Sequence, residues 1–313
     1  MMKLAFVFPG QGSQAVGMLA DMVDLPVVKN TVIEASDALG VDLLDMMQNG
    51  PAEALNLTVN TQPVMLTASV AFYRAWLEAG GAKPDIMAGH SLGEYSALTA
   101  ANVLSLTDAV KLVRLRAEAM QNAVPVGVGG MAAILGIDDA VVKQVCTDAQ
   151  AATGEIVEAV NFNSPGQVVI AGHKGAVEKA CELAKAAGAK RALVLPVSAP
   201  FHSTLLKPAA EKLQAALAEL TLKAPEIPVV NNVDVLVQND VAAIKDALVR
   251  QAWHPVRWVE CAQHIAEQGV TDMVECGPGK VLAGLAKRID ARLTGHALVN
   301  QESLAAIRAA LGS

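Results

Sequence analysis

Short runs of apolar residues alternate along this chain with longer segments in which apolar positions recur every three or four residues. The run at 4–8 is apolar at every position, which is typical of a strand buried on both faces of a parallel sheet. A second short apolar run, at 86–88, predicts another strand, and segments at 227–232 and 272–276 continue the pattern. Helices are predicted at 32–39, 61–79, 107–123, 205–220, 242–251 and 302–311. This order of elements favours an α/β fold.

The pattern changes after a glycine-rich break at 125–130. The segment beyond it is predicted to contain strands at 130–135, 155–160, 167–171 and 191–197, with helices at 138–149 and 175–187. This βαββαβ order is that of a ferredoxin-like unit, with 161–166 as a hairpin turn. We therefore expect an inserted ferredoxin-like domain, residues 128–197, within a main domain made of residues 1–127 and 198–313.

The segment Gly89-His90-Ser91-Leu92-Gly93 lies between a predicted strand and a predicted helix. G-x-S-x-G in that position is typical of a nucleophile elbow, where the serine is at the tip of a strained turn. The amide of Leu92 and the helix dipole would then favour an oxyanion beside Ser91. The same residues fit a second interpretation, because Ser91 and Glu94 also form S-x-x-E, a helix capping box that needs no catalysis.

Two loops contain candidate partners for Ser91. The glycine-rich loop 9–15 follows the first strand, and the backbone amide of Gln11 is a candidate second oxyanion donor. The G-x-G-x-x-A spacing of this loop matches a dinucleotide fingerprint weakly, since the acidic residue expected about 20 positions later is missing. His202 follows a predicted strand and is the candidate base. His90 is expected to point away from the serine. An α/β hydrolase has an Asp or Glu between serine and histidine to orient the base, and no well-placed acid lies between Ser91 and His202. A neutral carbonyl is the alternative.

Arg116 interrupts the apolar face of the helix predicted at 107–123. Ala109, Leu112, Val113 and Met120 share that face at 3.6 residues per turn. A guanidinium held against the core needs an anion, because an unpaired buried charge is unfavourable. That anion is either an internal carboxylate or part of a substrate.

Composition removes several classes of function. A net charge of −7 and an aromatic content of 3% leave no basic, base-stacking surface for nucleic acid. The apolar run near the start is too short for a signal peptide, and no run is long enough to span a bilayer, so we expect a soluble, cytoplasmic protein that does not bind membranes. The four cysteines lack C-x-x-C spacing and predict neither a zinc site nor disulfides.

Six motifs along the whole chain resemble those of the malonyl-CoA:acyl carrier protein transacylases of bacterial fatty acid synthesis. They are FPGQGSQ at 8–14, TQP at 61–63, GHSLGE at 89–94, VNFNSPGQ at 160–167, VNNV at 230–233 and ECGPGK at 275–280. The resemblance implies a hydrolase-like main domain with a mostly parallel sheet and a ferredoxin-like insertion. It also implies transfer of a malonyl group from malonyl-CoA to the pantetheine thiol of acyl carrier protein through a malonyl-serine intermediate.

The resemblance assigns roles to individual residues. It implies Ser91 as nucleophile, His202 as base, and the backbone amides of Gln11 and Leu92 as the oxyanion hole. No metal is implied, and no cofactor beyond the coenzyme A thioester that serves as substrate.

The same resemblance implies roles for three further residues. Arg116 is implied to bind the malonyl carboxylate, and the backbone carbonyl of Gln251 is implied to orient the histidine. Phe201 resembles the residue found in malonyl-selective acyltransferases of polyketide synthases.

Other interpretations stay open at this point. A serine esterase or thioesterase of similar fold would use water as acceptor, and a non-enzymatic module would only dock carrier protein. Acyl carrier proteins are acidic, so docking on this acidic chain requires a local basic patch. Lys287, Arg288 and Arg292 are the candidates, with the last two expected one helical turn apart. A solvated helix face is the alternative.

Overall fold

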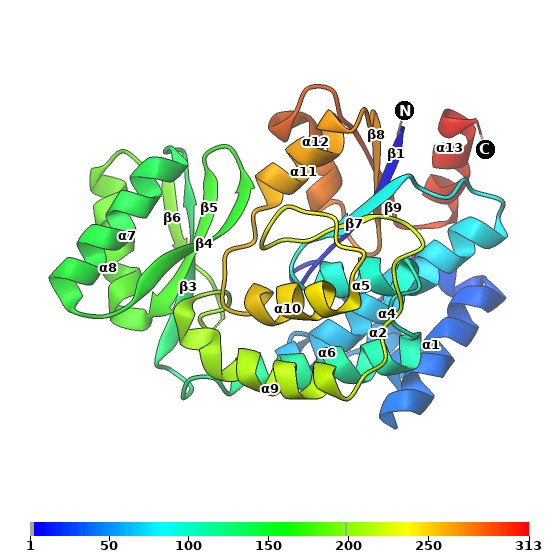
Figure 1. Cartoon of the computed structure of the whole chain (residues 1–313), viewed down its shortest axis with the longest axis horizontal. Helices are drawn as coiled ribbons and strands as arrows, with labels where there is room; N and C mark the ends of the chain where they lie inside the picture. Colours follow the sequence, from blue (N-terminus) through cyan, green and yellow to red (C-terminus); the bar gives the residue numbers. More distant parts are fainter. Residues whose placement is uncertain (1–2, 198, 313) are drawn as a thin grey trace.

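The computed structural model describes residues 3–197 and 199–312 (Figure 1). Its larger part is built on a parallel sheet of five strands in the order β7-β2-β1-β8-β9. The strands are β1 (Leu4–Phe8), β2 (Ile86–Gly89), β7 (Val229–Val230), β8 (Asp272–Cys276) and β9 (Thr294–Leu298). The central strand, β1, is buried at all five positions, as its continuous apolar run predicted.

Helices cover both faces of this sheet. Alternation along β1 directs Phe6 and Phe8 into one hydrophobic core, and Ala5 and Val7 into another. The first core includes side chains from α1 (Pro26–Leu39), α4 (Thr58–Glu78), α5 (Leu92–Ala100) and α6 (Leu106–Gln121). The second includes side chains from α11 (Trp258–Glu267) and α12 (Val281–Ile289). The result is a three-layer α/β/α arrangement.

Shorter or more peripheral helices complete this part of the chain. They are α2 (Leu43–Asn49), α3 (Ala52–Leu55), α9 (Lys207–Ala218), α10 (Val241–Gln251) and α13 (Gln301–Leu311). Within the described ranges, no helix combines the length and the apolar character needed to cross a bilayer.

An antiparallel sheet of four strands, in the order β4-β5-β3-β6, lies beside the parallel one. Its strands are β3 (Gly129–Leu135), β4 (Val157–Ser164), β5 (Gln167–His173) and β6 (Arg191–Val194). The helices α7 (Asp139–Thr153) and α8 (Lys174–Ala186) pack on it around a separate core. Figure 1 shows the sheet between these two helices and the rest of the chain. The predicted order of strands and helices in this segment is observed.

Some element boundaries differ from the prediction. The hairpin predicted at 161–166 is present, but its turn is confined to 165–166, because Asn161, Phe162 and Ser164 pair with β5 and extend β4. The strand predicted at 191–197 ends at Val194. The helix predicted at 205–220 begins at Lys207 after a short 3-10 turn. The predicted domain boundary at residue 198 falls outside the described residues.

Candidate active site

Ser91 occupies the tip of the turn between β2 and α5, so the predicted strand–turn–helix geometry is observed. Its φ of 53° and ψ of −111° lie in a region that side-chain-bearing residues rarely adopt. A Cβ atom on Gly89 would collide with the backbone of Gly93, and one on Gly93 would collide with the carbonyl of Phe8. Glycine at both positions therefore lets β1, β2 and α5 approach closely enough to form the turn.

The Ser91 side chain does not cap α5, so the capping-box interpretation is wrong. The Glu94 carboxylate instead accepts hydrogen bonds from the backbone amide of Asn232 and from the side chain of Gln251, each at 3.0 Å. The Asn232 side chain accepts from the amide of Ser91 at 2.9 Å and donates to the carbonyl of Gly89 at 2.7 Å. Asn232 thus holds both sides of the turn.

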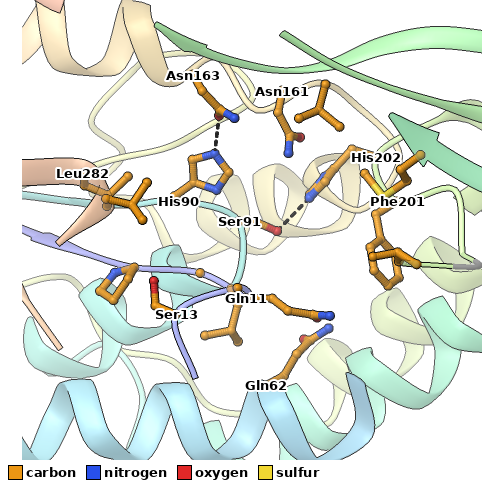
Figure 2. A pocket seen from close by; sticks show the side chains of 18 of the residues that line it. Gln11, Ser13, Gln62, His90, Ser91, Asn161, Asn163, Phe201, His202 and Leu282 are labelled. Atoms are coloured by element: carbon orange, nitrogen blue, oxygen red, sulfur yellow. Dashed lines mark hydrogen bonds between the residues drawn. The ribbon is translucent and has the colours of Figure 1, made fainter. Parts of the chain in front are cut away.

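His202 reaches Ser91 from the loop that precedes α9 (Figure 2). Its Nε2 lies 2.7 Å from Ser91 Oγ, and its Nδ1 lies 2.8 Å from the backbone carbonyl of Gln251. A carbonyl only accepts, so Nδ1 carries the proton and Nε2 accepts from the serine hydroxyl. Burial, reinforced by the nearby Arg116 charge, lowers the pKa of His202 to about 3. The imidazole is therefore neutral at physiological pH and available as a proton acceptor.

The Arg116 guanidinium is buried beside the same hydroxyl, with only 1% of the residue exposed. Its Nη2 donates to Ser91 Oγ at 3.1 Å and to Gln251 Oε1 at 3.0 Å, and its Nη1 donates to Gln62 Oε1 at 2.7 Å. The ring of Tyr95 lies 5.2 Å from Cζ. All of these partners are uncharged groups.

No carboxylate of the described chain forms an ion pair with Arg116, and its Nε has no hydrogen-bond partner there. The internal salt bridge considered from the sequence is therefore not observed. Burial lowers the pKa of Arg116, which indicates how poorly its charge is solvated. A cation in this setting is a strong binding point for an external carboxylate.

The two candidate oxyanion donors border the same space as the hydroxyl. Gln11 and Leu92 both line the cleft that contains Ser91. In the part of the chain that is described, neither backbone amide has a hydrogen-bond acceptor. The Gln11 side chain is held by Thr58, to which it donates at 3.1 Å. Both amides are thus free to donate to an oxygen that develops negative charge.

The cleft above Ser91 has a cavity volume of about 290 Å³. Met131, Val169 and Leu195, from the antiparallel sheet and the segment after it, form an apolar wall, and Leu282 of α12 lines another part. Such a cleft, apolar with a few convergent polar groups, is typical of a small-molecule site.

The structure adds residues that the sequence analysis did not assign to the site. His90 forms a 2.7 Å hydrogen bond with Asn163, not with Ser91, and its ring lines the cleft (Figure 2). Gln62 accepts a hydrogen bond from the Arg116 guanidinium, and Asn232 bonds both sides of the turn at Ser91. Gln62, Asn163 and Asn232 all fall inside motifs quoted for the family resemblance, which was the available signal.

The expected basic patch is only partly present. The helix α12 ends at Ile289, so Arg292 is not one helical turn from Arg288. Arg292 instead forms a two-point ion pair with Asp290, at 2.9 and 2.7 Å, beyond the end of the helix. Lys287 and Arg288 are exposed in the last turn of α12.

Comparison with known proteins agrees with this geometry. Residues 5–291 match the acyl transferase domain family. The malonyl CoA-acyl carrier protein transacylase of Salmonella typhimurium is 58% identical over 307 residues, which cover 98% of this chain and 99% of the relative. The chain belongs to the malonyl CoA-acyl carrier protein transacylase family.

Solved structures of the transacylase family share the fold. The acyl-carrier-protein S-malonyltransferase of Burkholderia pseudomallei is 65% identical with a TM-score of 0.96, over 98% of this chain and 99% of that one. A malonyl-transacylase in complex with a type II PKS acyl-carrier protein is 52% identical with a TM-score of 0.96, over 99% of this chain and 100% of that one. The α/β fold with one parallel and one antiparallel sheet is therefore that of the transacylase family.

Proposed function

We propose that this protein transfers a malonyl group from malonyl-CoA to the pantetheine thiol of acyl carrier protein, supplying extender units for fatty acid synthesis. The observation that carries the proposal is the position of Ser91 Oγ, 2.7 Å from a neutral imidazole and 3.1 Å from a buried guanidinium. Family membership supports the same reaction.

In the first half-reaction, Ser91 Oγ gives its proton to His202 Nε2 and attacks the thioester carbonyl. The backbone amides of Gln11 and Leu92 donate to the resulting oxyanion. The carbon–sulfur bond then breaks, and the proton on Nε2 moves to the departing sulfur of coenzyme A. The carbonyl of Gln251 holds the Nδ1 proton throughout, so the imidazole stays in the tautomer that accepts at Nε2.

In the second half-reaction, the carrier-protein thiol gives its proton to His202 Nε2 and attacks the malonyl-serine ester. The same two amides donate to the second oxyanion. When the bond to Ser91 Oγ breaks, the proton returns from Nε2 to that oxygen. The resting serine and imidazole are regenerated. Apart from coenzyme A and the pantetheine of the carrier protein, the proposed steps use only groups of this chain.

Arg116 selects the acyl group. Because its Nη2 is within hydrogen-bond distance of Ser91 Oγ, the free carboxylate of a malonyl group on that oxygen lies within its reach. The pairing also affects the base. The Arg116 charge contributes to the low pKa of His202, so an incoming carboxylate that offsets this charge raises the basicity of the imidazole.

We propose that the carrier protein docks at the mouth of the cleft. Lys287 and Arg288 lie on α12, whose residues Leu282 and Leu285 line the cleft. An acidic carrier protein that contacts these two side chains brings its pantetheine arm to the opening. The related transacylase in complex with an acyl-carrier protein supports such a partner.

The domain division that we propose has a hydrolase-like main domain, residues 1–127 and 198–313, and an inserted ferredoxin-like domain, residues 128–197. The separate core of the antiparallel sheet and its strand order support the division. We place the reaction in the cytoplasm. The four cysteines are buried and unpaired, in keeping with a reducing compartment.

Mass spectrometry of the intact protein tests the proposed reaction. Mixing with malonyl-CoA should give a malonyl adduct on Ser91, and subsequent addition of holo acyl carrier protein should remove it with malonyl carrier protein as product. Rapid loss of the adduct in buffer alone would identify a thioesterase instead. Failure to form any adduct would leave a non-enzymatic docking function.

A further inference from the structure

The buried carboxylate of Glu94 lies next to the site but does not line the cleft. Glu94 is one helical turn after Ser91 on α5 and is only 2% exposed. Its Oε2 accepts hydrogen bonds from the Asn232 amide and from Gln251 Nε2, each at 3.0 Å. The oxygen of the same Gln251 amide accepts from Arg116 Nη2 at 3.0 Å. One side-chain amide therefore bridges a buried anion and a buried cation.

We infer that Glu94 is the indirect counterion of Arg116, and that its charge limits how strongly the site prefers a malonyl group over an uncharged acyl group. This inference rests on the proposed function. Glu94 does not touch the substrate, and it acts through Gln251 and Arg116 as a positioning and specificity-determining residue.

In the described chain, no carboxylate forms an ion pair with Arg116. Without Glu94, the guanidinium would face the substrate as an uncompensated buried charge, which binds a carboxylate more tightly. Two hydrogen bonds of 3.0 Å each and one amide group separate Glu94 from the guanidinium, a path of roughly 8 Å. A carboxylate bound to the guanidinium lies one hydrogen bond farther from Glu94, and at roughly 11 Å and an effective dielectric constant of about 20 a unit charge changes a binding constant on the order of tenfold. Reversible transfer requires that the malonyl group also be released, and weaker binding of its carboxylate by Arg116 favours release.

The charge on Glu94 is adjustable near neutral pH. Burial raises its pKa to about 7, against the opposing effect of its two hydrogen-bond donors. The groups that face it are Arg116 on α6, Asp234 after β7, Tyr95 on its own helix and Cys261 on α11. Hydrogen bonding to an arginine lowers the pKa of Asp234, and burial raises the pKa of Tyr95 and of Cys261. Among these groups, Glu94 alone changes charge between mildly acidic and mildly basic pH.

The variant Glu94→Gln tests this role because it removes the charge and keeps the shape. Both donors bond one carboxylate oxygen, so a glutamine oxygen in that position accepts from both. The measurement is kcat/KM with malonyl-CoA divided by kcat/KM with acetyl-CoA, for acylation of carrier protein. One pH unit above the Glu94 pKa of about 7, we expect the ratio in the variant to exceed the wild-type ratio by about tenfold.

The pH dependence of the same ratio gives a second readout that a purely structural residue does not produce. Protonation neutralises Glu94, so the wild-type ratio should rise as the pH falls through about 7 and should approach the value of the variant. The ratio in Glu94→Gln should stay flat over that interval. Effects of pH on groups that serve both substrates cancel in the ratio.

Glu118→Gln is the matched control, since it removes an exposed carboxylate from the helix that contains Arg116. Its ratio should equal that of the wild type, because surface charge is screened. An unchanged or lower ratio in Glu94→Gln, or a proportional loss on both substrates, overturns the inference. If the variant does not fold, a flat wild-type ratio across pH 7 overturns it equally. A wild-type protein that forms no malonyl adduct would instead refute the proposed function.

Discussion

Replacing Arg116 by alanine separates substrate selection from the rest of catalysis. The guanidinium donates to Ser91 Oγ at 3.1 Å and Arg116 lines the cleft, so it contacts both the nucleophile and a ligand bound there. Loss of the first contact affects every substrate by a common factor. Loss of the contact with the ligand affects only acyl groups that have a carboxylate. A charge-assisted hydrogen bond is worth ~1.5–3 kcal/mol, so malonyl transfer should fall roughly 10–150-fold more than acetyl transfer.

The assay is single-turnover formation of the acyl-enzyme, measured by rapid quench and intact mass with malonyl-CoA and with acetyl-CoA. Arg114→Ala is the matched control, because this arginine lies on the same helix and bonds Glu118 and Asn60 outside the cleft. It should leave the ratio of the two rates unaltered. Equal losses on both substrates in Arg116→Ala would show a structural arginine and would refute the proposed clamp.

Four further outcomes are expected. Ser91→Ala should abolish the malonyl adduct seen by intact mass, and an adduct that persists would place the nucleophile elsewhere. His202→Ala should lower the transfer rate by ~10²–10⁴-fold, the usual contribution of a general base, and an unchanged rate would remove it from the mechanism. Burial lowers the pKa of both His202 and His90, so below about pH 6.5 the unfolded chain binds more protons at these two positions, which lowers stability by up to about 1.4 kcal/mol per pH unit for each histidine. Burial also raises the pKa of Glu94 and of Glu275 to about 7, which offsets the histidines down to the unfolded carboxyl value of 4.5. Thermal stability should therefore fall below about pH 4.5, and a profile that stays flat there would contradict this. Charge reversal at Lys287 and Arg288 should raise the KM for carrier protein, measured in steady state at several salt concentrations, and an unchanged KM would dismiss this docking surface.

Local signals in the sequence were sufficient where the structure itself is local. A fully apolar run followed by a glycine-rich loop predicted β1, and G-x-S-x-G between strand and helix predicted the turn at Ser91. The same local pattern also fitted a capping box. The hydrogen bond from Ser91 to His202, 111 positions away, distinguishes the nucleophile elbow from the capping box, and neither local pattern predicts that bond.

Other features depended on contacts that no single segment specifies. The position of Asn232 depends on bonds to Gly89 and Ser91, over 140 positions earlier in the chain. The stretch at 161–166 has turn chemistry, yet pairing with β5 extends the strand through most of it. Resemblance, and not periodicity, suggested Gln251, because a backbone carbonyl leaves no mark in the residue type.

The antiparallel sheet lines the cleft with Met131 and Val169 but supplies none of the groups bonded to the Ser91 hydroxyl. The imidazole and the guanidinium both belong to segments outside 129–194. One apolar wall of the cleft and the groups that act on the Ser91 hydroxyl are thus encoded in separate stretches of the gene. Descendants with a different acyl preference can arise through change in one stretch, while the reacting atoms keep their ancestral arrangement.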